Sequence, residues 1–385
     1  MKAIVYHGNK DIRYHENYPD PQIERSQDVK IKVHYCGICG SDLKEYTDGP
    51  IFFSNPDETN KISGKPAPQC MGHEMSGEIV EIGADVVNVS VGDKVVVEVT
   101  GSCLDQYRFP DSPNFKSEKC GACVEGHYNA CDHLGLIGLG FSDGGFSEYV
   151  VTDSSKAIKF SDDIIPMDVA ALTQPIAVSW HAVRMSGFKE GSSALIIGGG
   201  PIGLATIFAL KGHKAGTIVV SEPALARRLL AEKFNVKVFD PAGKSVQECV
   251  SELRKLSPTG FGFNYSYDCS GFPDTFNVNL KALCVRGVAT NVAVWANKPI
   301  PYYPMDVTFS EKIVTGSICF VKQDFEEVVE ALENGLIPIH EAKMLITSVI
   351  HLEDGIEKGF FELLNHKERQ IKVLFSPKDE HRSDS

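Results

Sequence analysis

No apolar run in this chain of 385 residues approaches the roughly 20 residues that a membrane-spanning helix requires. The chain also lacks the basic excess of a nucleic-acid-binding protein, because its formal net charge is −13. We therefore expect neither a membrane nor a nucleic acid as a partner. An anionic cofactor stays compatible with this charge, since a local pocket can be positive in an acidic protein.

Two further features are missing from the sequence. Residues 1–6 show no charged region followed by a long apolar one, so we interpret them as a first strand and not as a signal peptide. No internal repeat or low-complexity tract is present. The polar tail from Ser376 to Ser385 is expected to be frayed.

Cysteine, by contrast, is plentiful, with eleven residues in the chain. Four of them fall within one stretch, at Cys103, Cys120, Cys123 and Cys131. An odd total with one cluster favours metal binding in a reducing compartment over disulfide bonds. We therefore predict a cytoplasmic protein, with disulfide pairing as the alternative.

The length suggests about two domains. In the first 160 residues, short segments such as Lys30–Tyr35 and Lys94–Val99 alternate between apolar and polar residues, which predicts a β-rich domain. A long connection, residues 46–70, carries four prolines and is typical of a functional loop or lid. After Pro166, strand and helix patterns alternate, which is typical of a doubly wound parallel sheet.

The predicted fold class is α/β, with a six-stranded Rossmann sheet beside the β-rich domain. The sheet strands are expected at residues 192–197, 217–221, 237–239, 265–269, 285–295 and 313–320. Helices are expected at residues 168–184, 224–234, 245–256, 275–283 and 324–333. The predicted domains are a β-rich domain at 1–175 with a four-cysteine lobe at 103–131, a doubly wound domain at 176–318, and a return to the first domain at 319–385.

A glycine-rich turn follows the apolar strand Ala194–Ile197 and opens an apolar helix. Gly198 allows the tight turn, Gly200 lets the backbone approach a pyrophosphate, and Gly203 lets the helix pack closely on the strand. Because strand and helix are both present, this context favours a dinucleotide site over a chance glycine cluster.

Glu222 ends the next strand, nineteen residues after Gly203. A carboxylate there accepts hydrogen bonds from the adenosine ribose and repels a 2′-phosphate, which favours NAD over NADP. Glu222 could instead serve only as a helix-start carboxylate. Arg227 and Arg228 stand nearby, and a cation there could tolerate a phosphate.

The run Cys120-x2-Cys123-x7-Cys131, with Cys103 upstream, is typical of a structural zinc site. Four thiolates close a tetrahedron and leave no position for a substrate. Sixteen residues separate Cys103 from Cys120, where two are usual, so three unrelated loop cysteines are the alternative.

Cys39 and His73 offer a thiolate and an imidazole, two donors that zinc prefers. A histidine alone is more often a hydrogen-bonded core residue, but the neighbouring Glu74 and the Cys39 segment favour a metal ligand. A Lewis-acid metal and a nicotinamide cofactor in one chain indicate hydride transfer on an alcohol or ketone.

The run Gly72-His73-Glu74-Met75-Ser76-Gly77, with Gly83 beyond it, resembles the zinc signature of the medium-chain alcohol dehydrogenases. The segment Cys36–Asp42, the four-cysteine lobe and the glycine turn follow the same order as in that family. Residues 46–52, 267–271 and 304–308, with the insertion between Cys103 and Cys120, are similar to the fungal 2,3-butanediol dehydrogenase subgroup.

This resemblance implies a GroES-like fold for the first domain and a role for each matching residue. Cys39 and His73 would bind a catalytic zinc, Glu74 would be a direct or intermittent ligand, and Asp42 would hold the other nitrogen of His73. Ser41 would take the alcohol proton. The cofactor would be held by Gly198, Gly200, Ile202, Gly203, Glu222 and Arg227, with Val292, Ala293 and Val294 at the nicotinamide.

Three positions depart from the family pattern. Lys44 stands where many members end the Ser41 proton relay in a histidine. Gln174 stands where related enzymes carry a glutamate that binds zinc, so either Glu74 or Gln174 would be the third ligand. The arginine that polyol-using members often carry near Cys319 is missing, which argues mildly against long polyols.

The resemblance implies two zinc ions per chain and NAD as cofactor, and it suggests 2,3-butanediol, acetoin and diacetyl as substrates. A homodimer or homotetramer is expected. A sorbitol- or threonine-type zinc dehydrogenase is one alternative. The other is a weakly active zinc- and cofactor-binding regulatory protein, because Gln174 removes a negative charge from the site.

Overall fold

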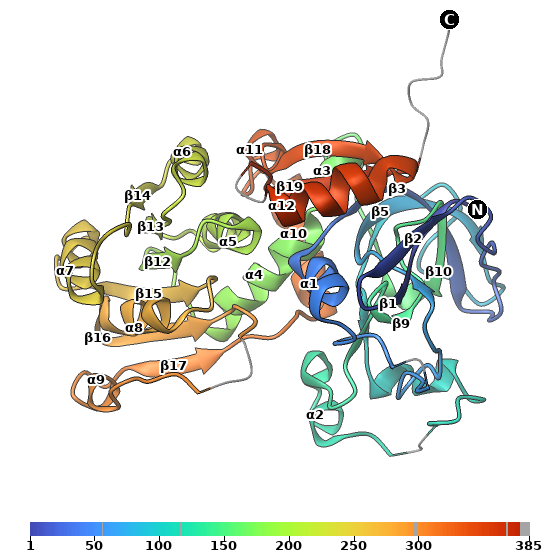
Figure 1. Cartoon of the computed structure of the whole chain (residues 1–385), viewed down its shortest axis with the longest axis horizontal. Helices are drawn as coiled ribbons and strands as arrows, with labels where there is room; N and C mark the ends of the chain where they lie inside the picture. Colours follow the sequence, from blue (N-terminus) through green and yellow to red (C-terminus); the bar gives the residue numbers. More distant parts are fainter. Residues whose placement is uncertain (56, 116–117, 296–298, 367–368, 378–385) are drawn as a thin grey trace, which may run out of the picture. The chain divides into compact units, whose positions relative to one another are not determined.

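The structure is a computed structural model of residues 1–385, and it describes all of them except 56, 116–117, 296–298, 367–368 and 378–385 (Figure 1). Most of the polar tail for which we predicted fraying thus lies outside the described residues. Two compact units make up the chain. The first contains Met1–Gln174, Val321–Glu333 and Ile346–Ser385, and the second contains Pro175–Phe320 and Asn334–Leu345. The domain boundaries given above stay predictions.

The first unit is β-rich. Its main sheet is antiparallel apart from one pair and, in the described part of the chain, has the order β11-β6-β5-β3-β19-β18, with β10 also paired to β3. These strands are β3 (Asp28–Gly37), β5 (Glu74–Ile82), β6 (Lys94–Val97), β10 (Tyr149–Asp153), β11 (Ala157–Lys159), β18 (Ile346–His351) and β19 (Lys372–Ser376). Alternation explains β3, because Val29, Ile31 and Val33 are buried between half-buried lysines.

Two smaller sheets complete the strands of the first unit. They contain β1 (Ala3–Gly8), β2 (Asp11–His15) and β4 (Gln69–Cys70), and then β7 (Thr100–Gly101), β8 (Gly135–Ile137) and β9 (Gly140–Ser142). The strand expected at the start of the chain is therefore present as β1.

The helices of the first unit are mostly short. They are α1 (Gly40–Asp48), α2 (Gly121–Val124), α3 (Met167–Ala170), α10 (Lys322–Glu333) and α12 (Glu362–Asn365), with 3-10 turns η1 (Cys103–Arg108), η2 (Tyr128–Ala130), η3 (Ser154–Lys156) and η4 (Leu352–Asp354) and a π-helical turn η5 (Gly355–Phe361). Among the described residues, no helix of either unit is long and apolar enough to cross a membrane.

The second unit contains the predicted doubly wound sheet. Its six strands within the described residues are all parallel and follow the order β14-β13-β12-β15-β16-β17 (Figure 1). They are β12 (Ser193–Ile197), β13 (Thr217–Ser221), β14 (Lys237–Phe239), β15 (Phe263–Asp268), β16 (Leu283–Asn291) and β17 (Ile313–Gly316). The α/β fold class predicted from the sequence is confirmed.

Helices accompany these strands in the second unit. They are α5 (Pro201–Gly212), α6 (Leu225–Lys233), α7 (Val246–Leu256), α8 (Pro273–Lys281), α9 (Met305–Thr308) and α11 (Ile339–Lys343). Buried apolar side chains lie on α5, α7 and α8, whereas α9 has no buried residue. Leu195, Val219, Leu253 and Phe263 lie in one buried cluster between helices and strands. Burial of such side chains stabilises the fold by about 1.5–3 kcal/mol each.

Three expected elements differ in the structure, one of them the strand expected at 313–320, which ends at Gly316. Instead of one helix over 168–184, α3 ends at Ala170 and α4 (Thr173–Met185) begins anew. Pro175 explains this restart, since proline is tolerated in the first turn of a helix and not in its interior. The strand expected at 285–295 ends at Asn291, so Val292, Ala293 and Val294 follow the carboxyl end of β16.

Candidate metal centres and dinucleotide site

The first centre joins the ends of two paired strands in the first unit. Cys39 follows β3 and caps the amino end of α1, while His73 and Glu74 stand at the start of β5. Gly37 of β3 is paired with Glu74 of β5, which brings the segments together. The donor atoms of Cys39, His73 and Glu74 all lie within 4.8 Å of one another. Strand pairing thus brings together donors that are more than thirty residues apart in the sequence.

Asp42 and Ser41 orient the imidazole of His73. Asp42 accepts a hydrogen bond from the backbone N–H of Cys39 at 2.8 Å, and its other oxygen lies 3.4 Å from Nδ1 of His73. Nε2 of His73 lies 3.2 Å from Oγ of Ser41. Burial disfavours a charged His73, but the Asp42 carboxylate outweighs burial and raises the pKa of His73.

These contacts provide a test of whether the donors fit a metal ion. Within the described residues, Nδ1 of His73 and Oδ1 of Asp42 are buried without a hydrogen bond of acceptable geometry. Because Asp42 lies at Nδ1, Nε2 is the nitrogen left to bind a metal. A thiolate, an imidazole nitrogen and a carboxylate oxygen at this separation are a donor set that suits zinc.

Lys372 was not among the residues predicted from the sequence, and it also contacts this centre. Its Nζ donates to both carboxylate oxygens of Glu74, at 2.7 and 2.6 Å, and to the carbonyl of Ile38 at 3.1 Å. Both side chains are buried, Lys372 to 4% exposure and Glu74 to 0%. Burial lowers the pKa of Lys372, but the opposing charge of Glu74 outweighs it and raises that pKa. The Glu74 carboxylate therefore has a charged partner as well as a place among the metal donors.

Gly37 is required by this arrangement. A Cβ at position 37 would lie 2.1 Å from Oε2 of Glu74, so any side chain there would displace the carboxylate. Leu374 of β19 pairs with the same glycine and brings Lys372 to the site. Lysine 372 could have been noticed as a lone charge within the apolar run of residues 371–375, but its partner lies 298 positions away.

The two remaining candidate site residues, Lys44 and Gln174, lie on different helices. Lys44 is half-buried on α1, about one turn beyond Ser41. Gln174 is buried in the first turn of α4, where the first unit ends. Proton relay through Lys44 and zinc ligation by Gln174 stay predictions.

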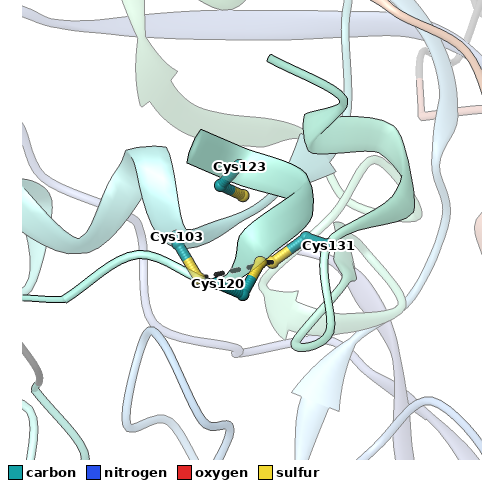
Figure 2. A group of neighbouring side chains, drawn as sticks. All are labelled: Cys103, Cys120, Cys123 and Cys131. Carbon is teal, nitrogen blue, oxygen red and sulfur yellow. Dashed lines mark hydrogen bonds between the residues drawn. The ribbon is translucent and has the colours of Figure 1, made fainter. Parts of the chain in front are cut away.

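The second centre consists of the four clustered cysteines (Figure 2). Cys131 Sγ lies 3.5 Å from that of Cys103 and 3.7 Å from that of Cys120. Four sulfurs bound to one zinc at about 2.3 Å would be about 3.8 Å apart, so the donors fit a closed tetrahedral site. None of the eleven cysteines forms a disulfide, and Cys103 joins the other three despite its distance in sequence.

Local hydrogen bonding prepares one of these thiols to ionise. Backbone hydrogen bonds at Asp132 and Cys123 lower the pKa of Cys120 to about 7. Burial raises the pKa of Cys123 to about 11 and also raises that of Cys131. The lowered pKa of Cys120 suits metal ligation, because the thiolate is the form that binds a metal.

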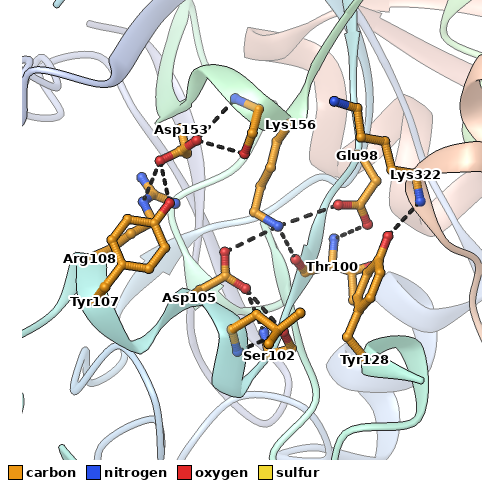
Figure 3. A network of polar contacts seen from close by, with 12 residues as sticks. Glu98, Thr100, Ser102, Asp105, Tyr107, Arg108, Tyr128, Asp153, Lys156 and Lys322 are labelled. Carbon is orange, nitrogen blue, oxygen red and sulfur yellow. Dashed lines mark hydrogen bonds and ion pairs between the residues drawn. The ribbon is translucent and has the colours of Figure 1, made fainter. Parts of the chain in front are cut away.

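A buried polar network explains how Cys103 reaches the lobe (Figure 3). Ser102 caps the turn η1 that begins at Cys103, and Asp105 accepts from the Ser102 backbone at 2.9 Å. Lys156 lies 3.3 Å from Asp105, 3.4 Å from Glu98 and donates to the Thr100 carbonyl. Burial opposes the Lys156 charge, but Glu98 and Asp105 outweigh it and raise its pKa. This lysine therefore fixes η1 against the main sheet.

In the second unit, the glycine turn lies between β12 and α5 as expected. Gly198 has a φ of +99°, and a Cβ there would lie 2.4 Å from Oγ of Ser270. A Cβ at Gly203 would lie 1.8 Å from the Gly198 carbonyl, so α5 could not approach the strand. Gly200 caps α5, and the nearest atom to a Cβ there is an Arg227 nitrogen at 3.8 Å. Ile202 lies in the first turn of α5. This open cradle at a helix amino end suits a pyrophosphate.

The carboxylate of Glu222 is fixed at the end of β13. Its oxygens accept hydrogen bonds from the backbone N–H groups of Gly199 at 2.6 Å and Ala224 at 2.8 Å. Arg228 is engaged elsewhere, with Asp240 at 2.6 Å and with the Glu222 and Pro223 carbonyls. Of the two suspected cations, Arg227 is therefore the one beside the glycine turn.

A cavity of about 270 Å³ opens next to these residues. Its lining includes Ile197, Ser221, Pro241, Ser270 and Thr275, at and beyond the carboxyl ends of β12, β13, β14 and β15. Ligands of doubly wound sheets bind at this edge. Val292 and Ala293 follow β16 at the same edge, where their N–H groups donate to the Asp268 carbonyl at 3.0 Å, and Val294 is exposed.

Comparison with known proteins decides the family. The alcohol dehydrogenase GroES-like domain matches residues 25–162, and the zinc-binding dehydrogenase domain matches residues 201–334. The (R,R)-butanediol dehydrogenase of Saccharomyces cerevisiae is 50% identical over 98% of this chain and 98% of that protein. The chain belongs to the zinc-dependent medium-chain alcohol dehydrogenase family.

Two further family members are similar over nearly their whole length. A Saccharomyces cerevisiae protein named probable diacetyl reductase ((R)-acetoin forming) 2 is 48% identical over 98% of this chain and 90% of that protein. The crystal structure of 2R,3R-butanediol dehydrogenase from Bacillus subtilis superposes with a TM-score of 0.84 at 35% identity, covering 98% of this chain and 99% of that one. The resemblance inferred from the sequence is confirmed.

Proposed function

We propose that this chain is an NAD(H)-dependent zinc dehydrogenase that interconverts a small secondary alcohol and its ketone, with 2,3-butanediol, acetoin and diacetyl as substrates. The meeting of Cys39, His73 and Glu74 carries the proposal, in a chain 50% identical to an (R,R)-butanediol dehydrogenase. The glycine turn at Gly198–Gly203, which suits a dinucleotide, supports the proposal that the reaction transfers a hydride to or from a nicotinamide cofactor.

In this reaction, zinc held by the first centre would supply Lewis-acid stabilisation of charge on the substrate oxygen, and the nicotinamide would accept or return the hydride. The side chains handle the proton. Ser41 Oγ lies beside Nε2 of His73, so its hydroxyl is the group assigned to take the alcohol proton. Lys44 is the next candidate along α1 to pass that proton on. Asp42 keeps the ring of His73 in place.

The third metal ligand is assigned to Glu74 or to Gln174. Glu74 is supported by its donor atom, which lies within reach of the Cys39 and His73 donors. Its ion pair with Lys372 opposes this, because the same oxygens would serve both the lysine and the metal. Glu74 is therefore proposed as an intermittent ligand of the metal, and Lys372 as its ion-pair partner when it is not bound to the metal.

We propose NAD over NADP, and a zinc ion at each of the two centres. The Glu222 carboxylate is fixed by two backbone N–H groups at the strand end, where its charge would repel a 2′-phosphate. The ratio of kcat/KM for NADH and NADPH tests the cofactor: an advantage of about tenfold or more for NADH is expected. A preference for NADPH would contradict this assignment and would implicate Arg227.

The proposed assembly is a homodimer or homotetramer. In the described part of the chain, β17 pairs only with β16, and its Ile313 and Val314 side chains are 56% and 42% exposed. An exposed apolar edge strand is a ready surface for a second copy of the chain. Sedimentation of the protein and of Val314→Lys tests this: monomeric wild-type protein, or a variant assembled like wild type, would contradict it. The cytoplasmic location stays a prediction.

A substrate panel tests the reaction. Oxidation of NADH is measured with diacetyl, acetoin, fructose and simple ketones, and the protein's zinc is counted in parallel. Highest kcat/KM with diacetyl or acetoin is expected. Faster turnover of fructose would favour a sorbitol-type enzyme. Reduction of NAD with threonine, measured in a parallel assay, would favour a threonine-type enzyme. No turnover of any substrate by zinc-loaded protein would favour the regulatory alternative.

A further inference from the structure

Arg228 joins the carboxyl ends of β13 and β14 in the second unit. Ser221 and Phe239 are paired across these parallel strands. The N–H of Glu222 donates to the Phe239 carbonyl at 3.1 Å, which continues the pairing beyond the strand ends. Asp240, the residue after Phe239, therefore stands beside the segment whose carboxylate we expect at the adenosine ribose.

The guanidinium of Arg228 is held by one carboxylate and two main-chain oxygens. Its Nη2 lies 2.6 Å from Oδ2 of Asp240. Its Nη1 donates to the carbonyls of Glu222 at 2.8 Å and Pro223 at 2.6 Å. The Arg228 side chain is 13% exposed, whereas that of Asp240 is 45% exposed. Asp240 therefore supplies the only charge in a set of contacts that keeps this cation on the main chain.

Asp240 is itself oriented by the chain that follows it. Its Oδ1 accepts a hydrogen bond from the N–H of Ala242 at 2.9 Å, which leaves Oδ2 for the arginine. Pro241 lines the cavity beyond the strand ends, and so does Pro223, whose carbonyl binds Arg228. The ion pair is therefore adjacent to the lining of the cavity that suits the cofactor.

This placement bears on the choice between NAD and NADP. A 2′-phosphate on the adenosine ribose is accommodated by an arginine near the end of this strand. Arg228 contacts the main chain of Glu222, so its guanidinium lies close to where that phosphate would be. Lys244 is a second cation that lines the cavity, and its Nζ lies 3.1 Å from Glu252.

We propose that Asp240 is a positioning residue that sets cofactor specificity, because it holds the Arg228 guanidinium on the main chain and away from a 2′-phosphate. This inference rests on the proposed function, in which Glu222 meets the ribose of NAD. Discrimination against NADPH then has two parts. Glu222 repels the phosphate, and Asp240 withholds the cation that would bind it.

The kcat/KM for NADPH divided by that for NADH, measured on zinc-loaded protein, tests the proposal. Glu222→Gln removes the repulsion. Asp240→Asn in that background should raise the ratio by a further factor of about ten, because a charge-assisted hydrogen bond from Arg228 to the phosphate becomes possible. Asparagine can still accept from the Ala242 N–H, so the turn is kept. Adding Arg228→Met should abolish the gain, whereas a merely structural role of Asp240 would change both cofactors alike.

Asp274→Asn is the matched control. Asp274 is an exposed carboxylate at the start of α8 that lines the same cavity, so its loss removes the same charge from a different element. In the Glu222→Gln background it should raise the ratio by about twofold or less, since solvent screens an exposed charge. An equal gain from Asp274→Asn would overturn the proposal. So would a gain that survives Arg228→Met, which would implicate Lys244.

Nucleotide binding gives a second measurement that needs neither zinc nor turnover. Calorimetry compares adenosine 2′,5′-bisphosphate with adenosine 5′-monophosphate, after thermal melts show that each variant is folded. Asp240→Asn in the Glu222→Gln background should bind the bisphosphate about tenfold more tightly, with the monophosphate nearly unchanged. Unchanged affinity for the bisphosphate would overturn the proposal. A wild-type preference for NADPH would instead contradict the proposed function, whereas the Asp240 effect is measured between variants.

Discussion

The two metal centres of the first unit are built from opposite principles. The four-cysteine centre uses one donor type, and its residues lie within 29 positions of sequence, from Cys103 to Cys131. The Cys39 centre uses three donor types and draws on β3, β5 and the distant strand β19. A closed site of four thiolates stabilises its lobe, whereas a site of fewer ligands keeps a position for substrate.

The residues that support the two centres also differ in whether they contact the metal donors. Lys156, Glu98 and Asp105 hold η1, and none of them touches a cysteine sulfur in the contacts described above. Lys372 instead binds Glu74, one of the three donors themselves. A change in the support should therefore affect folding at the closed centre and metal ligation at the open one.

Cys39→Ala should separate the two centres most sharply. Loss of the Lewis acid removes several kcal/mol of transition-state stabilisation, so the rate should fall about 10³-fold or more. The variant should stay folded and hold about one zinc, since the closed centre is intact. Turnover and zinc content measure this, with Cys36→Ala as a buried neighbouring control. A folded Cys39→Ala protein with two zinc ions would break the comparison.

Cys123→Ala should act on stability first. Zinc at a closed thiolate site contributes about 10 kcal/mol or more to folding in small domains, so its loss should unfold the lobe. A large drop in melting temperature is expected. The control variant Cys284→Ala, in the second unit, should have a melting temperature near that of the wild type. If Cys123→Ala melts like the wild type, the centre has no structural role.

Lys372→Met should show how much the Lys372–Glu74 ion pair contributes to stability at the open centre. It leaves the Glu74 carboxylate buried without its partner, which costs about 3–5 kcal/mol in the metal-free protein. Glu74→Gln in the same background should restore much of that stability, because both charges are then gone. Denaturant melts of the four proteins measure the coupling. Additive effects would mean that the pair is energetically unimportant.

Gln174→Glu should have the smallest effect. A carboxylate holds zinc more tightly than an amide, so the variant should stay active and lose zinc to a chelator more slowly. Glu74→Gln should be more damaging in the natural protein than in the Gln174→Glu background. The double variant decides this, and strictly additive effects on activity and zinc retention would show that the two residues do not share the metal.

Local patterns in the sequence were enough to predict the doubly wound sheet. The strand and glycine turn at residues 194–203 lie where their apolar run and glycine spacing predicted. The four cysteines also meet as predicted, although Cys103 reaches them through the Lys156 network, which no local pattern indicates.

The open centre was harder to anticipate. Cys39 and His73 carry recognisable motifs, whereas the Lys372–Glu74 pair joins residues 298 positions apart through sheet pairing. The sequence analysis also missed a helix break. One helix was expected over residues 168–184, but α3 ends at Ala170 and α4 begins at Thr173, because a gap of two residues barely changes the apolar spacing.

Two zinc ions with separable roles should leave this chain one after the other, and a chelator time course measures their loss. Zinc release, turnover and melting temperature are followed in one sample of wild-type protein. Two zinc ions per chain should be lost in two phases: loss of the first abolishes turnover in a folded protein, and loss of the second unfolds the protein. A total of one zinc or none, or a single phase in which activity and fold are lost together, would contradict it.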